Sequence, residues 1–155
     1  MDVIALRDVD NELSFIKSLG HGGFGVILMA QNLHSGEIVA VKTMQRNPGA
    51  GISDPLREIC LMKECDHENV IKFHGAYCSF TDHRAFYIAM ELCGGGSLCD
   101  LYEDVGAFHE EETAFVCREV LKGLKYLHGN GILHRDIKGD NILVTDIGDV
   151  KICEY

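Results

Sequence analysis

The sequence has 155 residues, and its 14 Lys and Arg residues against 24 Asp and Glu residues give a formal net charge of −10. This acidic balance argues against a surface that binds nucleic acid or another polyanion. Hydrophobic residues make up 46% and charged residues 25% of the chain, which excludes a disordered protein and is typical of one globular domain or two small lobes.

The sequence contains neither a predicted membrane span nor a secretory signal. No apolar run approaches the roughly 18 residues of a spanning helix, and the first residues lack a basic flank and a long apolar core. The seven cysteines are odd in number and include no C-x-x-C pair, so we expect reduced, mostly buried thiols. A metal site at Cys60, Cys65 and His67 is disfavoured because no second ligand pair follows at zinc-finger spacing. We therefore expect a soluble, cytoplasmic protein.

The first part of the chain is rich in strand patterns. Short runs of Val, Ile, Leu and Phe predict strands at residues 13–19, 26–30, 38–44, 73–79 and 85–92. A loop at 48–54 precedes a predicted helix over 55–64, in which Pro55 suits the first turn. The last two strands are separated by a polar turn at 81–83.

A flexible Cys-Gly-Gly-Gly stretch at 93–96 separates this strand-rich part from a helical part. We therefore expect two regions, 1–92 and 93–155. In the second region Ser97 can cap a short helix that ends at Glu103, because a serine hydroxyl accepts a hydrogen bond from a free N–H group of the first turn.

The longest predicted helix covers residues 110–128. Its apolar stripe has helical spacing and comprises Val116, Val120, Leu124 and Leu127, widened by Cys117 and Leu121. Three glutamates suit the positive end of its dipole, and the Gly-Asn-Gly at 129–131 ends it. The tail predicts a hairpin formed by 142–145 and 149–153.

A glycine motif of the form G-x-G-x-x-G covers residues 20–25. A plain glycine turn would also explain it, because the chain is rich in glycine. A dinucleotide-binding fingerprint would open a helix after the last glycine, whereas residues 26–30 continue as a strand. The motif therefore predicts a hairpin tip whose backbone N–H groups can approach phosphates, with Phe24 closing over them.

The next pattern is Val-Ala-Val-Lys at 39–42, where alternation places Ala40 and Lys42 on one face of the strand. Ala40 leaves room for a flat ring, and Lys42 could supply a positive charge for phosphates. A lysine at a strand end that reaches solvent is the simpler interpretation. Glu58, otherwise an ordinary surface residue of the predicted helix, could pair with Lys42 and hold its ammonium group still.

The most specific pattern is H-R-D-I-K-G-D-N at 134–141. An H-R-D followed five residues later by Asn is improbable from composition, which disfavours the interpretation as a merely charged loop. Phosphoryl transfer needs a carboxylate that orients the substrate hydroxyl, a cation against the moving charge and an oxygen ligand for Mg²⁺. Asp136, Lys138 and Asn141 could fill these three roles.

The order of these motifs resembles the protein-kinase family, and the resemblance runs from Leu13 to Tyr155. It implies an α+β, protein-kinase-like fold with a five-stranded antiparallel N-lobe and one helix in 1–92, then the hinge and the first part of a helical C-lobe in 93–155. Lys138 is similar to the serine/threonine pattern. Residues 90–98 and 134–141 resemble the germinal-centre kinase branch, whose members act upstream in MAP-kinase cascades.

The resemblance implies ATP and Mg²⁺ as cofactors, protein substrates that include other kinases of a signalling cascade, and no nucleic-acid partner. By position, Asp136 would be the catalytic base, with Lys138, Lys42 and Glu58 as further catalytic residues. Asn141 and Glu154 would hold Mg²⁺. The residues that would contact ATP are Leu19, Gly20, His21, Gly22, Gly23, Phe24, Gly25, Val26, Ile27, Ala40, Lys42, the gatekeeper Met90, the hinge residues Glu91 and Cys93, and Leu143.

Two departures from the family pattern bear on activity. The family continues with Asp-Phe-Gly where this chain has Glu154 and Tyr155, and the longer Glu must still satisfy the near-octahedral geometry of Mg²⁺. The activation segment and the later helices of the large lobe are absent. Without those helices the apolar stripe of the helix at 110–128 would face water, so we expect either that the chain is a fragment of a longer product or that the stripe is buried elsewhere. We expect poor solubility or self-association of the isolated chain.

Three functions follow from these observations. The first is a serine/threonine protein kinase, and the second is a catalytically impaired, ATP-binding pseudokinase or regulatory fragment. The third, a nucleotide-binding protein outside the kinase family, leaves the H-R-D pattern unexplained.

Overall fold

The computed structural model describes residues 7–22, 25–45, 55–81 and 85–154. They form two compact units, one within Met1–Glu64 and Phe73–Leu92, the other within Cys65–Lys72 and Cys93–Tyr155. The division after Leu92 lies at the glycine-rich stretch. The segment Cys65–Lys72, which we expected in the first region, packs with the second unit. The predicted loop at 48–54 and most of the turn at 81–83 lie outside the described residues.

The first unit is built on a sheet in which the described residues form six strands, in the spatial order β1-β5-β6-β4-β3-β2. The strands are β1 (Arg7–Asp8), β2 (Leu13–Gly22), β3 (Gly25–Asn32), β4 (Ile38–Gln45), β5 (Phe73–Cys78) and β6 (Ala85–Glu91). The prediction of five antiparallel strands missed β1, which pairs in parallel with β5. Two residues are too few to show the alternation by which strands are predicted.

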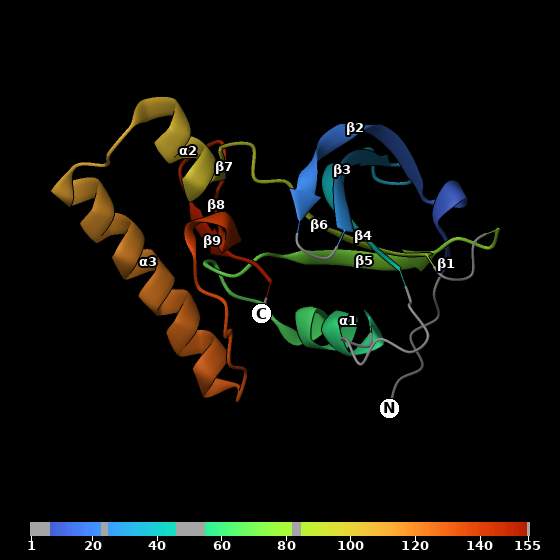
Figure 1. The fold of residues 1–155 in the computed structure, drawn as a ribbon. Coiled ribbons are helices and arrows are strands. Elements are labelled where there is room, and N and C mark those ends of the chain that lie inside the picture. The colour runs from blue at the N-terminus through green and yellow to red at the C-terminus, as the bar shows by residue number, and fades with distance from the viewer. Residues whose placement is uncertain (1–6, 23–24, 46–54, 82–84, 155) are drawn as a thin grey trace. The chain divides into compact units, whose positions relative to one another are not determined.

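Alternation along β4 gives the two faces of this sheet different partners. Val39 and Val41 are fully buried in a core cluster with Leu13 and Tyr77. The opposite face of β4 carries Lys42, which pairs with a side chain of helix α1 (Pro55–Glu64). Figure 1 shows α1 lying along the sheet beside β5. The helix and all five predicted strands form as expected from their hydrophobic periodicity.

The second unit combines two helices with a small sheet. Its elements are β7 (Gly96–Ser97), α2 (Leu98–Val105), α3 (Glu110–Gly129), β8 (Ile142–Val144) and β9 (Val150–Ile152), with a short 3-10 turn at Gly139–Asn141. The predicted hairpin of β8 and β9 forms, and β7 pairs with β8. Ser97 caps α2 as predicted, within a reciprocal capping box with Asp100.

The apolar stripe of α3 is covered by other parts of the chain, which is one of the two alternatives expected for it. Val120 packs with Ile142, Val150 and Ile152 of the hairpin, and Val116 and Leu124 join this cluster. Leu127 packs instead against Cys65 and Val70 of the segment Cys65–Lys72. The sequence pattern identified the stripe correctly but could not identify its cover, which comes from distant parts of the chain.

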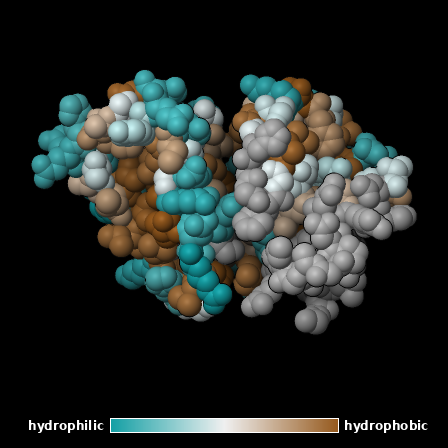
Figure 2. Space-filling model, viewed as in Figure 1, coloured by the Kyte–Doolittle hydropathy of each residue, from teal (hydrophilic) through white to brown (hydrophobic). Residues whose placement is uncertain are grey.

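Other apolar side chains of α3 do reach solvent. Leu121 is 64% exposed and Phe115 40% exposed, and hydrophobic colour is visible over this part of the second unit in Figure 2. Cys117 and Leu121, which widen the apolar stripe in the sequence, are both exposed and lie outside the covered part of the stripe. All seven cysteines are free thiols, but only Cys65 and Cys153 are buried. Within the described ranges, no helix combines the length and hydropathy needed to cross a bilayer.

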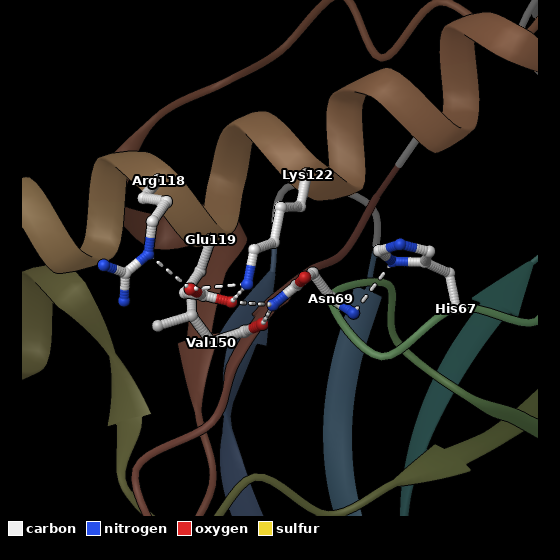
Figure 3. Close-up of polar contacts among 6 residues, drawn as sticks. All are labelled: His67, Asn69, Arg118, Glu119, Lys122 and Val150. Atoms are coloured by element: carbon white, nitrogen blue, oxygen red, sulfur yellow. Dashed lines mark hydrogen bonds and ion pairs between the residues drawn. The ribbon is translucent and has the colours of Figure 1, made fainter.

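A buried polar cluster holds the segment Cys65–Lys72 in the second unit (Figure 3). The Asn69 amide donates to Glu119 Oε2 at 3.1 Å and to the carbonyl oxygen of Val150 at 3.0 Å. Hydrogen bonds from Lys122 and Arg118 lower the pKa of Glu119 to about 2. The carboxylate therefore stays charged and links the segment to α3 and to the last hairpin.

Candidate active site

The expected ion pair between Lys42 and Glu58 is present in the first unit. Lys42 Nζ lies 2.9 Å from Glu58 Oε1, and the lysine is only 3% exposed. This burial rules out the interpretation of Lys42 as a strand-end lysine reaching solvent. A buried ammonium group needs a charged partner, and the carboxylate of α1 supplies one while fixing its position.

The glycine motif lies where β2 turns into β3, with Gly22 opposite Gly25 and Gly20 opposite Ile27. The chain continues as a strand after Gly25, as predicted. Gly23 and Phe24 lie outside the described residues, so the expected closure by Phe24 stays a prediction. A Cβ atom at Gly20 would meet no described atom within 4 Å. The space beside Gly20 is therefore open, as a site for a ligand requires.

Gly25 needs to be glycine for a different reason. A Cβ atom there would overlap the backbone carbonyl oxygen of Thr43 on the neighbouring strand. The last glycine of the motif is thus fixed by the contact between β3 and β4, whatever binds at the turn.

The other predicted ATP contacts divide between the two units. In the first unit Ala40 lies directly opposite the gatekeeper candidate Met90, and both are buried. Leu19 is exposed on β2, His21 lies near the end of that strand, and Glu91 ends β6. Half-buried Cys93 and Leu143 belong to the second unit. Nucleotide contact at each of these positions remains a prediction.

The H-R-D loop of the second unit brings three predicted residues together. Asn141 Nδ2 donates to the backbone oxygen of Asp136 at 2.9 Å and to Asp136 Oδ2 at 3.0 Å. Lys138 Nζ lies 3.0 Å from the same carboxylate oxygen. Hydrogen bonds from Lys138 and then Asn141 lower the pKa of Asp136, and its carboxylate raises the pKa of Lys138. Asp136 is thus an exposed, oriented and ionised carboxylate.

These contacts also orient the Asn141 side chain. Both partners of its amide are acceptors, so the amide nitrogen must face Asp136 and the oxygen Oδ1 must point the other way. The backbone N–H of Cys153 donates to the backbone oxygen of Asn141 at 3.1 Å. This hydrogen bond holds Cys153, the residue before Glu154, close to the loop. The charge of Glu154 also contributes to raising the pKa of Lys138.

The oxygen groups of Asn141 and Glu154 fit Mg²⁺ by their chemistry, because Mg²⁺ prefers hard oxygen ligands. The described residues contain no cluster of three or more His, Cys, Asp or Glu side chains able to hold a metal. Two protein ligands are nevertheless sufficient for an ion that keeps several waters and bridges substrate phosphates.

His134 supports the loop in a way that sequence reasoning did not identify. It is buried, and its Nδ1 accepts a hydrogen bond from the backbone N–H of Asp136 at 3.3 Å. Burial lowers its pKa, although a backbone hydrogen bond at Cys153 acts in the opposite direction. The intervening Arg135 has a left-handed φ of 68°. The initial His of the H-R-D pattern was the only available signal, and it does not reveal this packing.

Comparison with known proteins identifies the class. The protein kinase domain family matches residues 13–155, and the chain belongs to this family. It is 40% identical to mitogen-activated protein kinase kinase kinase kinase 3 of Homo sapiens over 152 residues. It is 42% identical to serine/threonine-protein kinase dst1 of Dictyostelium discoideum over 137 residues. The expected resemblance to MAP kinase kinase kinase kinases is thereby confirmed.

The alignments cover 98% and 88% of this chain but only 17% and 18% of the two relatives. A plant relative, serine/threonine-protein kinase 1 of Arabidopsis thaliana, is 40% identical over an alignment of 156 positions that covers 99% of this chain and 18% of the relative. The family match excludes the hypothesis of a nucleotide-binding protein outside the kinases. The names of these relatives give no support to the pseudokinase alternative.

Proposed function

We propose that this chain provides the nucleotide-binding and catalytic-loop part of a serine/threonine protein kinase that transfers the γ-phosphoryl group of ATP to a protein hydroxyl. The observation that carries the proposal is the Asp136, Lys138 and Asn141 network, in which one exposed carboxylate is ionised and oriented by two neighbours. The buried pair of Lys42 and Glu58 adds a fixed cation of the kind that phosphate binding requires.

Each group has a role suited to its environment. Lys42 would bind phosphate oxygens while Glu58 keeps its ammonium group in place. Asp136 would accept a hydrogen bond from the substrate hydroxyl. Because its pKa is lowered, this carboxylate is a weak base, so it would orient the hydroxyl first. It would take the proton as the hydroxyl oxygen bonds to the γ-phosphorus and the bond from that phosphorus to the departing ADP oxygen breaks. Lys138 would stabilise the negative charge on the phosphoryl group during its transfer.

Mg²⁺, when bound, would neutralise charge on the phosphates, and Asn141 Oδ1 and the Glu154 carboxylate are the groups that would hold it. The left-handed φ of 63° at Glu154 sets the direction in which its side chain leaves the backbone after β9.

We further propose protein kinases of a MAP-kinase cascade as substrates and the cytoplasm as the location. The names of the mammalian relatives support the cascade. Lys138, two residues after Asp136, supports serine and threonine as acceptors, because the serine/threonine pattern has a lysine there.

The test uses the 155-residue chain and its Asp136→Asn variant. We expect ATP with Mg²⁺ to raise the melting temperature of both proteins, and phosphate transfer to a basic protein substrate to fall about 10²- to 10⁴-fold in the variant. Asp140→Asn, which changes an exposed carboxylate in the same loop, should retain transfer. Absence of transfer by the unmodified chain, or equal transfer by Asp136→Asn, would contradict the proposal.

A further inference from the structure

Thr43 makes a paired contact with the backbone at the start of β3. The register between β3 and β4 ends with Ile27 opposite Lys42. One residue further on, Thr43 Oγ1 donates to the carbonyl oxygen of Val26 at 3.0 Å and accepts from the N–H of Val26 at 3.1 Å. A single hydroxyl therefore satisfies both backbone groups of Val26, and it extends the pairing of the two strands beyond the ladder.

The neighbouring Gly25 shows how closely the two strands approach at this point. A Cβ atom on Gly25 would overlap the carbonyl oxygen of Thr43 and would lie 3.3 Å from its Oγ1. The backbone of Gly25 thus packs directly on Thr43. The Thr43 hydroxyl can bond to Val26 only while β3 and β4 remain this close. The absence of a side chain at Gly25 therefore permits the hydrogen bonds of Thr43.

This contact joins the two parts of the proposed nucleotide site that lie in the first unit. Gly25 and Val26 come directly from the glycine motif, and Thr43 follows Lys42 in the chain. The Lys42 ammonium group is itself fixed by Glu58. The hydroxyl of Thr43 therefore sets the distance between the backbone that leaves the glycine motif and the strand that carries the lysine.

We propose that Thr43 is a positioning residue of the nucleotide site, which holds the start of β3 in register with Lys42 before any nucleotide binds. This inference rests on the proposed function. Preorganising the backbone reduces the ordering cost that ligand binding would otherwise incur. The hydroxyl should therefore affect the KM for ATP more than kcat, because it touches neither the phosphoryl group nor the acceptor.

A threonine hydroxyl is suited to this role because it both donates and accepts. Valine has nearly the same shape and can do neither, whereas serine keeps the hydroxyl and loses only the methyl group. Thr43→Val and Thr43→Ser therefore separate hydrogen bonding from packing. Thr113→Val makes the same chemical change at an exposed threonine of α3, and it serves as the control.

The first measurement is amide hydrogen exchange at Val26 in the full chain without nucleotide, followed by NMR. We expect exchange about five- to tenfold faster in Thr43→Val, the loss typical of one hydrogen bond. Thr43→Ser and Thr113→Val should stay close to the unmodified protein. An unchanged Val26 amide in Thr43→Val, or equal acceleration in Thr43→Ser, overturns the role of the hydroxyl.

The second measurement is initial-rate kinetics with varied ATP. We expect the KM for ATP to rise about five- to tenfold in Thr43→Val, the same factor as the increase in the exchange rate. The value of kcat should change less than about twofold. Faster exchange at Val26 with an unchanged KM overturns the positioning role. If the unmodified chain binds no nucleotide, the proposed function and the positioning role both fail, whereas the exchange result still reports on the hydroxyl.

Discussion

Lys42 shows what alternation along a strand can predict and what it cannot. The pattern at 39–42 predicted that Lys42 lies on the face of the strand opposite to the two valines. The expected ion pair between Lys42 and Glu58 is present in the structure. The pattern did not reveal that the lysine is buried. That burial depends on α1, which reaches β4 from a different part of the chain. Because the ion pair is buried, we expect substitution of Lys42 to cost folding stability.

The first residue-scale prediction concerns this ion pair. Lys42→Met leaves the carboxylate of Glu58 without its cation, and Glu58→Leu leaves a buried ammonium group. We expect each variant to lose about 3 kcal/mol of unfolding free energy, the lower end for a buried pair, because the Glu58 side chain is still 18% exposed. Urea denaturation at 25 °C measures this free energy.

The double variant Lys42→Met/Glu58→Leu tests whether the loss comes from the pair. Two apolar side chains can replace a buried ion pair at little cost, so we expect the double variant to lose clearly less than the sum of the single losses. Strict additivity would show that the two side chains do not stabilise each other.

At the scale of an element, helix α2 begins with a reciprocal cap. Ser97 Oγ accepts from the backbone N–H of Asp100 at 3.1 Å, and Asp100 Oδ2 accepts from the Ser97 backbone at 2.9 Å and from its hydroxyl at 2.7 Å. The sequence predicted Ser97 as the cap. The contribution of Asp100 follows from the geometry, since its carboxylate closes the second half of the box.

This cap predicts a dependence of stability on pH. Hydrogen bonds from Ser97 lower the pKa of Asp100 in the folded protein. The stabilisation is therefore complete above the ordinary Asp value of about 3.9 and is lost as pH falls through the lower folded value. We expect Asp100→Asn to show a smaller loss of unfolding free energy between pH 7 and pH 3 than the unmodified protein.

Two variants complete this experiment. Asp104→Asn alters an exposed carboxylate near the end of the same helix and should retain the original pH dependence. Ser97→Ala should cost about 1 kcal/mol at pH 7. Identical pH profiles for Asp100→Asn and the unmodified protein would contradict the assigned role of the carboxylate.

At the scale of the molecule, the division into units does not follow the chain. The composition change at 93–96 marks one boundary, but the segment Cys65–Lys72 belongs with residues that come much later. Asn69 and Glu119, which join it to α3, are separated by 50 residues. The Ile71 N–H donates to Ile152 O at 2.9 Å, and the Ile152 N–H donates to Asn69 O at 2.9 Å. Local patterns carry no information about such contacts.

The prediction at this scale is that Asn69→Ala weakens the attachment of this segment. Loss of the buried amide removes the donor to the Val150 carbonyl oxygen and one of the two donors to Glu119 Oε2, which keeps Lys122, and we expect this to cost about 1–3 kcal/mol. We expect faster amide exchange at Ile71 and Ile152. Arg118→Ala removes a mostly exposed partner of the same carboxylate and should cost less than about 1 kcal/mol. Equal effects of the two substitutions would show that the segment is held by other contacts.

The candidate site was predictable where function depends on residue type and spacing. The Asp136, Lys138 and Asn141 group and the pair of Lys42 and Glu58 were identified from the sequence, and the structure brings the members of each together. The left-handed backbone at Arg135 and Glu154 was not predictable, because side chains other than glycine rarely adopt it. Nor was the contact of Thr43 with Val26, which depends on how two strands meet.

The hydrogen bonds of Asn141 constrain how this loop can evolve. Replacing its amide by a carboxylate of the same shape would set two like charges against each other and would remove the donor that the Asp136 backbone oxygen uses. A single nucleotide change from Asn to Asp is easy genetically, yet here it would cost both orientation and charge balance. We therefore expect positions 136 and 141 to evolve together, so that a tolerated change at one position requires a matching change at the other.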